Sequence, residues 1–318
     1  MGVIDTLTAG FDLVRRKPWL IVVPLAVDLG LWLMPRLSIA GLVREMLTLL
    51  GTSAAGSPGV PPNLVEFSQL WQQLAESLDV GQLLAGASVP PAYLGVPSLP
   101  PDGVRSLFGL TRSVIEIRGP LTLLVLAAGL FLAGLLVSTL YLGMLGQSVR
   151  DGRVDWALLL RRLPRNWLRL VSAWVLVQVA LLIIGFPLIL TLALAAAVLG
   201  PLSLLVVSAL MFWVVIYVAF VPYGIFLHED GLLPAVARSV NVVRANFKST
   251  LGLIVLVFVI WFGLTLVFVR LTGTTIGALV AMAANAFVGT GLTAAMFIFY
   301  RERVRAWQAA VTGQRSQA

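Results

Sequence analysis

The chain has no cysteine, one histidine and few charged residues. Only 11% of its 318 residues are charged, against roughly 25% in an ordinary soluble domain. The absence of cysteine excludes disulfides, iron–sulfur clusters, thiolate zinc sites and thiol catalysis. No nucleophile–base pair, phosphate loop or carboxylate dyad occurs at a spacing that supports catalysis. We therefore expect no enzyme activity and no cofactor.

Apolar residues dominate instead. They make up 59% of the chain, and one stretch from Val171 to Leu227 contains a single interior glutamine, Gln178, and no charge. A bilayer core of about 30 Å takes about 20 apolar residues per helix, so this stretch alone holds at least two membrane-spanning helices. The sequence predicts an all-α, polytopic transmembrane bundle, with residues 1–318 as a single integral membrane domain.

Six spans account for the apolar regions. Their predicted limits are Pro18–Arg36, Gly119–Gly146, Leu168–Leu199, Leu202–Leu227, Leu251–Val269 and Thr275–Tyr300. The third is long and carries Gly185 and Pro187 near its middle, so one kinked helix or two separate spans would fit it. Charge favours six spans, because a seventh would place the basic residues after Leu227 on the outer side, against the positive-inside rule.

The same rule places both termini on the cytoplasmic side of the inner (cell) membrane. Most of the 22 lysines and arginines then lie inside, and those outside are Arg36, Arg44, Arg105, Arg112, Arg118 and Arg270. A cleaved signal peptide is the alternative for the first span, since Arg15-Arg16-Lys17 precede it and Ser38–Ala40 resembles a cleavage site. Asp28 and Pro24 within the apolar run argue against cleavage.

Residues 38–118 form the one large segment outside the predicted spans, an extracytoplasmic insertion between the first two. Eight of the 17 prolines fall between Pro58 and Pro101, so one compact helical domain is not expected. Two helices are predicted within it, a weaker one over Ile39–Leu50 and a stronger one over Leu64–Leu78 with Asn63 as its N-cap. They either lie on the outer membrane surface or form a lid or docking surface.

Three cytoplasmic stretches share one form, in which a short basic helix ends in an aromatic residue that leads into a span. They are Leu13–Leu20, Leu160–Leu168 and Val243–Lys248. We therefore expect three hairpins, each preceded by a cytoplasmic interfacial helix. Basic residues would lie at lipid phosphates, with Trp19 and Trp167 at headgroup level.

The third interfacial helix has the clearest pattern. Its apolar stripe consists of Leu233, Val236, Val240, Val243 and Phe247. Asp230 is its predicted cap, and Pro234 falls in the first turn, where a missing N–H costs little.

The junction between the fourth and fifth spans carries a more specific pattern. It reads Phe220-Val-Pro-Tyr-Gly-Ile-Phe-Leu-His-Glu229, then Gly231, Ala235-Val-Ala-Arg-Ser239 and Arg244-Ala-Asn-Phe247, and Tyr300-Arg-Glu-Arg ends the last span. This pattern resembles uncharacterised six-helix bacterial membrane proteins related to the membrane domain of glycerophosphoryl diester phosphodiesterases. The residues that carry the resemblance are Pro222, Glu229, Gly231, Ala235, Arg238, Ser239, Asn246, Phe247 and Tyr300.

The resemblance implies a six-helix fold with cytoplasmic termini. It does not imply phosphodiesterase activity, because in such fusions the catalytic part is a separate soluble domain. The proline-rich segment of residues 38–118 has no counterpart in the family pattern.

Three polar residues fall inside predicted spans. Asp28 carries the one formal charge well inside a span, which costs about 2.5–3.5 kcal/mol at a helix centre. Gln178 lies at similar depth in the third span, and Asn285 lies in the sixth. They form a proton or cation relay, or they tie helices together by hydrogen bonds. His228 beside Glu229 and Asp230 suggests a metal, but consecutive residues rarely converge on one ion, so a capped turn is the preferred interpretation.

Two functions remain open. The first is a non-catalytic membrane protein that organises lipid or assists a partner complex. The second is a carrier or permease for a small or lipid-like solute, which would use Asp28, Gln178 and Asn285. In both, the expected partners are membrane lipids with anionic headgroups at the cytoplasmic face and a possible membrane protein partner. Nucleic acid is not expected, because the basic residues are scattered at helix ends.

Overall fold

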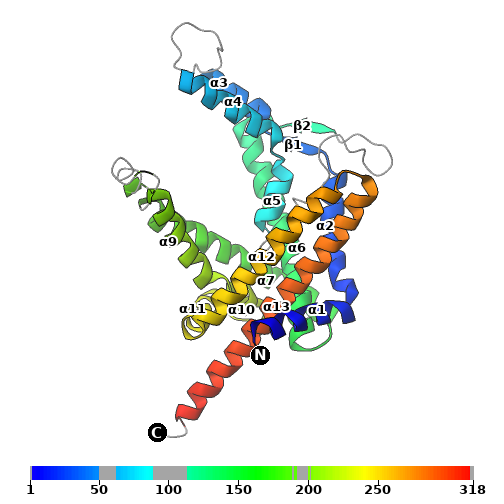
Figure 1. The fold of residues 1–318 in the computed structure, drawn as a ribbon, viewed down its shortest axis with the longest axis vertical. Coiled ribbons are helices and arrows are strands. Elements are labelled where there is room, and N and C mark those ends of the chain that lie inside the picture. Colours follow the sequence, from blue (N-terminus) through cyan, green and yellow to red (C-terminus); the bar gives the residue numbers. More distant parts are fainter. Residues whose placement is uncertain are drawn as a thin grey trace. The chain divides into compact units, whose positions relative to one another are not determined.

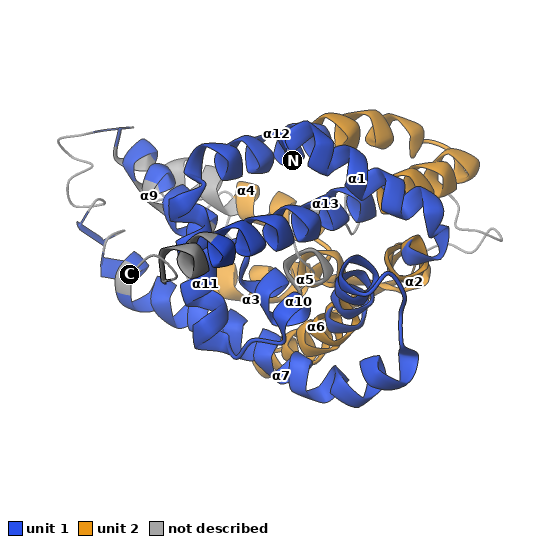
Figure 2. Cartoon of the chain, turned by 90° about the horizontal axis from the view of Figure 1, so that it is seen from below, with its two compact units in different colours: residues 1–20, 139–262, 287–318 blue, residues 21–138, 263–286 orange. Residues whose placement is uncertain are grey.

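The structure is a computed structural model that describes residues 2–49, 62–88, 113–187, 190–191, 200 and 202–315. It divides into two compact units, which are described separately (Figure 2). Unit 1 comprises residues 1–20, 139–262 and 287–318. Unit 2 comprises residues 21–138 and 263–286. Three long helices therefore contribute residues to both units.

Helices make up most of the described chain (Figure 1). In chain order they are α1 (Val3–Arg16), the 3-10 turn η1 (Pro18–Ile21), α2 (Val22–Leu33), α3 (Ala40–Leu49), α4 (Pro62–Ser77), α5 (Val80–Ser88), α6 (Pro120–Arg150), α7 (Trp156–Ala180), the π-helical turn η4 (Leu181–Gly185), α9 (Leu202–Val218), α10 (Val221–His228), α11 (Leu232–Ala245), α12 (Phe247–Leu271) and α13 (Thr275–Arg315). Two strands, β1 (Arg36–Ser38) and β2 (Val114–Glu116), pair in parallel.

Four helical segments in the described residues are long and apolar enough to cross a membrane. They are Pro120–Arg150, Trp156–Ile183, Phe247–Leu271 and Thr275–Ala309. In a bilayer the apolar side chains of such a helix lie against hydrocarbon, and its backbone N–H and C=O groups hydrogen-bond to each other within the helix. The chain is thus a helical membrane protein, as its composition predicts.

The first and fourth predicted spans correspond to shorter helices. Pro18–Leu33 is a 3-10 turn followed by α2, and the fourth region contains α9 of 17 residues and the separate α10. The interruption between α9 and α10 has a local cause, because Pro222 at the start of α10 lacks the N–H that a continuous helix would use.

The third predicted span differs from expectation at its start, and the structure has an irregular turn at its predicted kink. The basic stretch before it is no separate surface helix: α7 runs unbroken from Trp156 to Ala180 with Pro164 inside it. At the predicted kink, η4 widens the helix into a π-turn that ends at Gly185, two residues before Pro187. Such insertions are a usual cause of bends in long helices. Residues 192–199 lie outside the described chain.

Unit 2 contains the parts of the predicted outer segment that the structure describes. α3 and α4 begin and end within a residue or two of the predicted helices and pack against each other. α4 starts at Pro62, so Asn63 is not its N-cap. The two short strands were not predicted from the sequence. The Asp79 carboxylate supports them by accepting the N–H of Leu37 at 3.4 Å and that of Gly81 at 3.0 Å.

Small residues bring helices of unit 1 into close contact. A Cβ added to Gly10 of α1 would lie 2.5 Å from the carbonyl oxygen of Gly291 and 2.7 Å from the amide nitrogen of Ala295, so the backbones of α1 and α13 touch. A Cβ on Gly224 of α10 would lie 3.4 Å from that of Ala235 on α11. Close approach over small residues is the usual mode of packing for helices in lipid.

Candidate functional site

The candidate site is the turn that joins α10 to α11. His228 ends α10 and Gly231 is the N-cap of α11, so Glu229 and Asp230 form the turn. Glu229 has a φ of 59° and is the one non-glycine residue with positive φ in the described chain. Glycine is usual in this left-handed position, because a Cβ there costs about 1–2 kcal/mol. A glutamate here needs a compensating interaction.

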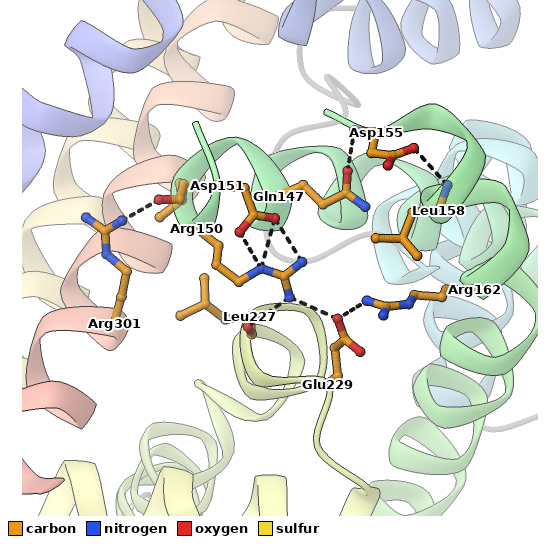
Figure 3. Close-up of polar contacts among 10 residues, drawn as sticks. Gln147, Arg150, Asp151, Asp155, Leu158, Arg162, Leu227, Glu229 and Arg301 are labelled. Atoms are coloured by element: carbon orange, nitrogen blue, oxygen red, sulfur yellow. Dashed lines mark hydrogen bonds and ion pairs between the residues drawn. The ribbon is translucent and has the colours of Figure 1, made fainter. Parts of the chain in front are cut away.

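Arginines from α6 and α7 provide that interaction. Nη1 of Arg150 lies 3.0 Å from Oε1 of Glu229, and Arg162 pairs with the same oxygen (Figure 3). Arg169, two turns further along α7, donates through Nη1 to the backbone carbonyl of Glu229 at 2.9 Å. Arg150 also pairs with Asp151 at 2.9 Å. The cations thus surround the C-terminus of α10, whose free carbonyls carry partial negative charge.

The loop between α6 and α7 is fixed by further polar contacts (Figure 3). Oε1 of Gln147 accepts the backbone N–H of Asp155 at 2.9 Å, and Oδ1 of Asp155 accepts the N–H of Leu158 at 3.0 Å, which caps α7. Arg301 of α13 donates to the carbonyl of Val149 near the end of α6. These contacts provide hydrogen-bond partners for backbone groups at the end of α6 and the start of α7. They therefore hold in place the two helix ends that carry Arg150 and Arg162.

The α11 side of the turn is held by two interactions. Oδ2 of Asp230 lies 2.6 Å from Nη1 of Arg238, so Asp230 forms an ion pair and is not the helix cap that the sequence suggested. The buried Ser239 donates through Oγ to the carbonyl of Tyr217 at 2.7 Å, which joins α11 to the end of α9. Ala235 is fully buried.

An aromatic cluster packs beside the turn. Tyr300 is fully buried, its ring stacks on Phe220 with centroids 5.5 Å apart, and His228 meets it edge-on at 5.8 Å. Burial lowers the pKa of His228 below its ordinary value, and the positive charge of Arg238 lowers it further. The imidazole is therefore neutral near pH 7.

The remaining residues of the family-like pattern also have structural roles in unit 1. Pro222 occupies the first turn of α10. Asn246 ends α11 and donates through Nδ2 to the carbonyl of Val242 at 3.2 Å. Phe247 begins α12 and stacks on Trp213, with centroids 5.2 Å apart and an interplanar angle of 9°. The pattern thus describes how α9 to α13 fit around one turn.

The three candidate polar residues inside predicted spans, Asp28, Gln178 and Asn285, differ in burial and in the unit to which they belong. Asp28 of α2 and Asn285 of α13 are both buried in unit 2, with 0% and 5% of their surfaces exposed. Asp28 lies one turn before Trp32, Asn285 lies one turn after Met282, and Trp32 packs against Met282. Gln178 belongs to unit 1, and its side chain is exposed on α7.

The arginine cluster is the functional feature that sequence reasoning missed. The sequence places Arg162 and Arg169 on the cytoplasmic side but does not identify their partner. Their spacing of seven residues places them on one face of a helix, and that pattern could have indicated a shared acidic partner. Within the described residues, no group of three or more histidine, aspartate or glutamate side chains could hold a metal ion.

The chain matches a known family model over most of its length. A domain of unknown function, DUF7847, matches residues 1–310. Because the match covers nearly the whole chain, the protein belongs to this family. No curated protein and no solved structure matches the chain.

Proposed function

We propose that this protein is a non-catalytic membrane protein that organises anionic lipid, or supports a partner complex, at the cytoplasmic face. The observation that carries the proposal is the set of arginines fixed around Glu229 at the end of α6 and the start of α7. These helices are two of the candidate spans, so their ends lie at headgroup depth. A rigid cationic surface at that depth attracts anionic lipid by about 1 kcal/mol per basic residue.

The proposal includes the finer topology. It has six spans arranged as three hairpins, with the shorter Pro18–Leu33 and the α9–α10 pair as the first and fourth. The likeness of the α10–α11 segment to six-helix relatives of phosphodiesterase membrane domains supports this arrangement. The basic loops support an inner-membrane location with both termini in the cytoplasm.

Introduced cysteines test the orientation, because the native chain has none. Single cysteines at Asp5, Arg153, Ala245 and Gln308 should be shielded from an impermeant thiol reagent in intact cells. One at Ala85 should react. Labelling at Gln308 together with protection at Ala85 would reverse the proposed orientation.

The lipid function is tested by what the protein retains on purification. The full chain, extracted in mild detergent and washed, should carry anionic phospholipid in a higher proportion than the membrane it came from. A bound fraction with the composition of the bulk membrane, and no co-purifying protein, would contradict the proposal.

A carrier is the second candidate, and one observation favours it. Asp28 is completely buried in unit 2, one turn from Trp32, and a carboxylate at the centre of a membrane-spanning helix costs about 2.5–3.5 kcal/mol, so such residues usually have a function. Reconstituted vesicles provide the test. Proton- or cation-coupled flux that is present in the wild type and lost in a well-folded Asp28→Asn variant would establish the carrier, because an amide cannot titrate.

A further inference from the structure

A second feature of unit 1 lies where the segment after α1 meets the loop between α6 and α7. Trp19 follows the basic run that ends α1, and Trp156 is the first residue of α7. These positions are far apart in the sequence, yet the two rings are in contact, with centroids 6.0 Å apart. Lys17 donates to the carbonyl of Gly152 and ties the two segments together.

The apolar part of this surface is exposed. Trp19 exposes 37% of its surface, Trp156 51%, and Leu160, one turn further along α7, 57%. Tryptophan is enriched where membrane meets water, because its ring is apolar and its N–H still finds a polar partner. Trp156 begins one candidate span, and the loop before it follows another. The surface therefore lies at the level where lipid headgroups begin.

The polar part of the surface is positively charged. The side chains of Arg16, Arg153 and Arg161 are all exposed. The neighbouring carboxylates are engaged by other groups: Asp12 pairs with Arg15 at 3.2 Å, Asp151 with Arg150 at 2.9 Å, and Asp155 accepts the N–H of Leu158 at 3.0 Å. The positive charge beside the tryptophans is thus left to attract an external anion.

We propose that this surface, defined as Arg16, Lys17, Trp19, Arg153, Trp156, Leu160 and Arg161, binds the headgroups of anionic phospholipids. The indole rings and Leu160 lie against the upper acyl chains, and the guanidinium groups bind phosphate oxygens. The inference rests on the proposed lipid-organising function and assigns it to particular residues, separate from the arginines that contact Glu229.

The test titrates phosphatidylglycerol or phosphatidylcholine into the detergent-solubilised full chain and follows thermal stability. The surface variant is Arg16→Gln/Arg153→Gln/Arg161→Gln. The matched control is Arg44→Gln/Arg118→Gln/Arg270→Gln, which removes the same charge from exposed positions of unit 2 that are predicted to lie on the outer side. Each basic residue at a membrane surface contributes about a factor of five, so we expect the surface variant to bind phosphatidylglycerol on the order of a hundredfold more weakly. The control should change less than about fivefold.

The outcomes separate this inference from the function on which it rests. Equal weakening in both triple variants would overturn the surface assignment but leave lipid organisation standing. A wild type that does not distinguish the two lipids would overturn both. Loss of a co-purifying protein in the surface variant, with lipid binding unchanged, would show that the surface docks a protein and would also overturn the assignment.

A second variant tests the aromatic half independently of net charge. Trp19→Ala/Trp156→Ala should lose about tenfold in apparent affinity for phosphatidylglycerol in the same detergent titration, because two interfacial rings are removed. Its thermal stability without added lipid should stay close to that of the wild type, since both rings are substantially exposed. An unchanged affinity in a folded variant would contradict a membrane role for the tryptophan pair.

Discussion

Two acidic residues of this chain lie in opposite environments. Glu229 of unit 1 stands in a strained turn and has guanidinium groups around both its carboxylate and its carbonyl. Asp28 of unit 2 is completely buried one turn from Trp32, in the helix pair where Trp32 packs against Met282. The two acidic groups therefore differ in position, because one lies among arginines at a helix end and the other is buried in a packed helix pair.

The difference predicts that the two positions tolerate change differently. At Glu229 we expect the charge itself to be needed, because several cations have been brought together at one point and repel each other without it. At Asp28 we expect the shape and hydrogen-bonding capacity to matter more than the charge, because complete burial disfavours the ionised carboxylate.

The largest expected effect comes from Glu229→Gln. The amide keeps the size of the side chain but removes the carboxylate that pairs with both Arg150 and Arg162, which leaves Arg150 with Asp151 alone. We expect a loss of about 2 kcal/mol in unfolding free energy, less than the 3–5 kcal/mol of a fully buried pair, since a third of the carboxylate is exposed. Asp151→Asn is the control, as it removes another carboxylate from the same Arg150 at a more exposed position. A similar loss in both variants would show that Glu229 has no special role.

The next effect tests Asp28. Asp28→Leu removes a buried polar group and leaves any polar neighbour unsatisfied, so detergent stability should fall by about 1–3 kcal/mol. Asp28→Asn retains hydrogen-bonding capacity and should be neutral or slightly stabilising. If Asn destabilises as much as Leu, the charge at position 28 is required and the contrast with Glu229 disappears.

Much of the fold could be predicted from the sequence, because apolar length is a strong signal in a membrane protein. Hydropathy located every long helix, and periodicity located α3 and α4. The sequence pattern predicted the helix boundaries less accurately. Pro164 lies inside α7, where the sequence suggested two helices, and the break before α10 interrupts an apolar run without any polar residue. Both depend on packing between neighbouring helices, which a local pattern does not contain.

The candidate site was predicted only in part. The family-like pattern located the α10–α11 turn, but Asp230 pairs with Arg238 and does not cap α11. The partners of Glu229 lie 60 or more residues away in sequence, so nothing near the turn identifies them. The apolar stripe of α11 was also incomplete: Leu233 is 73% exposed, and the side that packs on protein includes the small residues Ala235 and Ser239.

A smaller effect tests how firmly α11 is fixed beside Glu229. Ser239→Ala removes the donor to the carbonyl of Tyr217, which should cost about 1 kcal/mol. Ser172→Ala is the matched control, because Ser172 also donates to a backbone carbonyl, that of Leu168 at 2.7 Å, but is exposed. The control should change stability by less than about 0.5 kcal/mol. Equal thermal denaturation of the two variants would show that the α9–α11 contact is not rigid.

The smallest effect concerns pH and involves His228, the one histidine of the chain. Its folded pKa is lowered from 6.5 by burial and by Arg238, so below pH 6.5 the unfolded chain binds a proton that the folded protein refuses. Stability should therefore fall as pH drops from 7 to 5.5, with a slope below the single-proton limit of about 1.4 kcal/mol per pH unit. His228→Gln should flatten this part of the curve, since glutamine does not titrate. Parallel curves for wild type and variant would mean that neither burial nor Arg238 lowers the pKa of His228 in the folded protein.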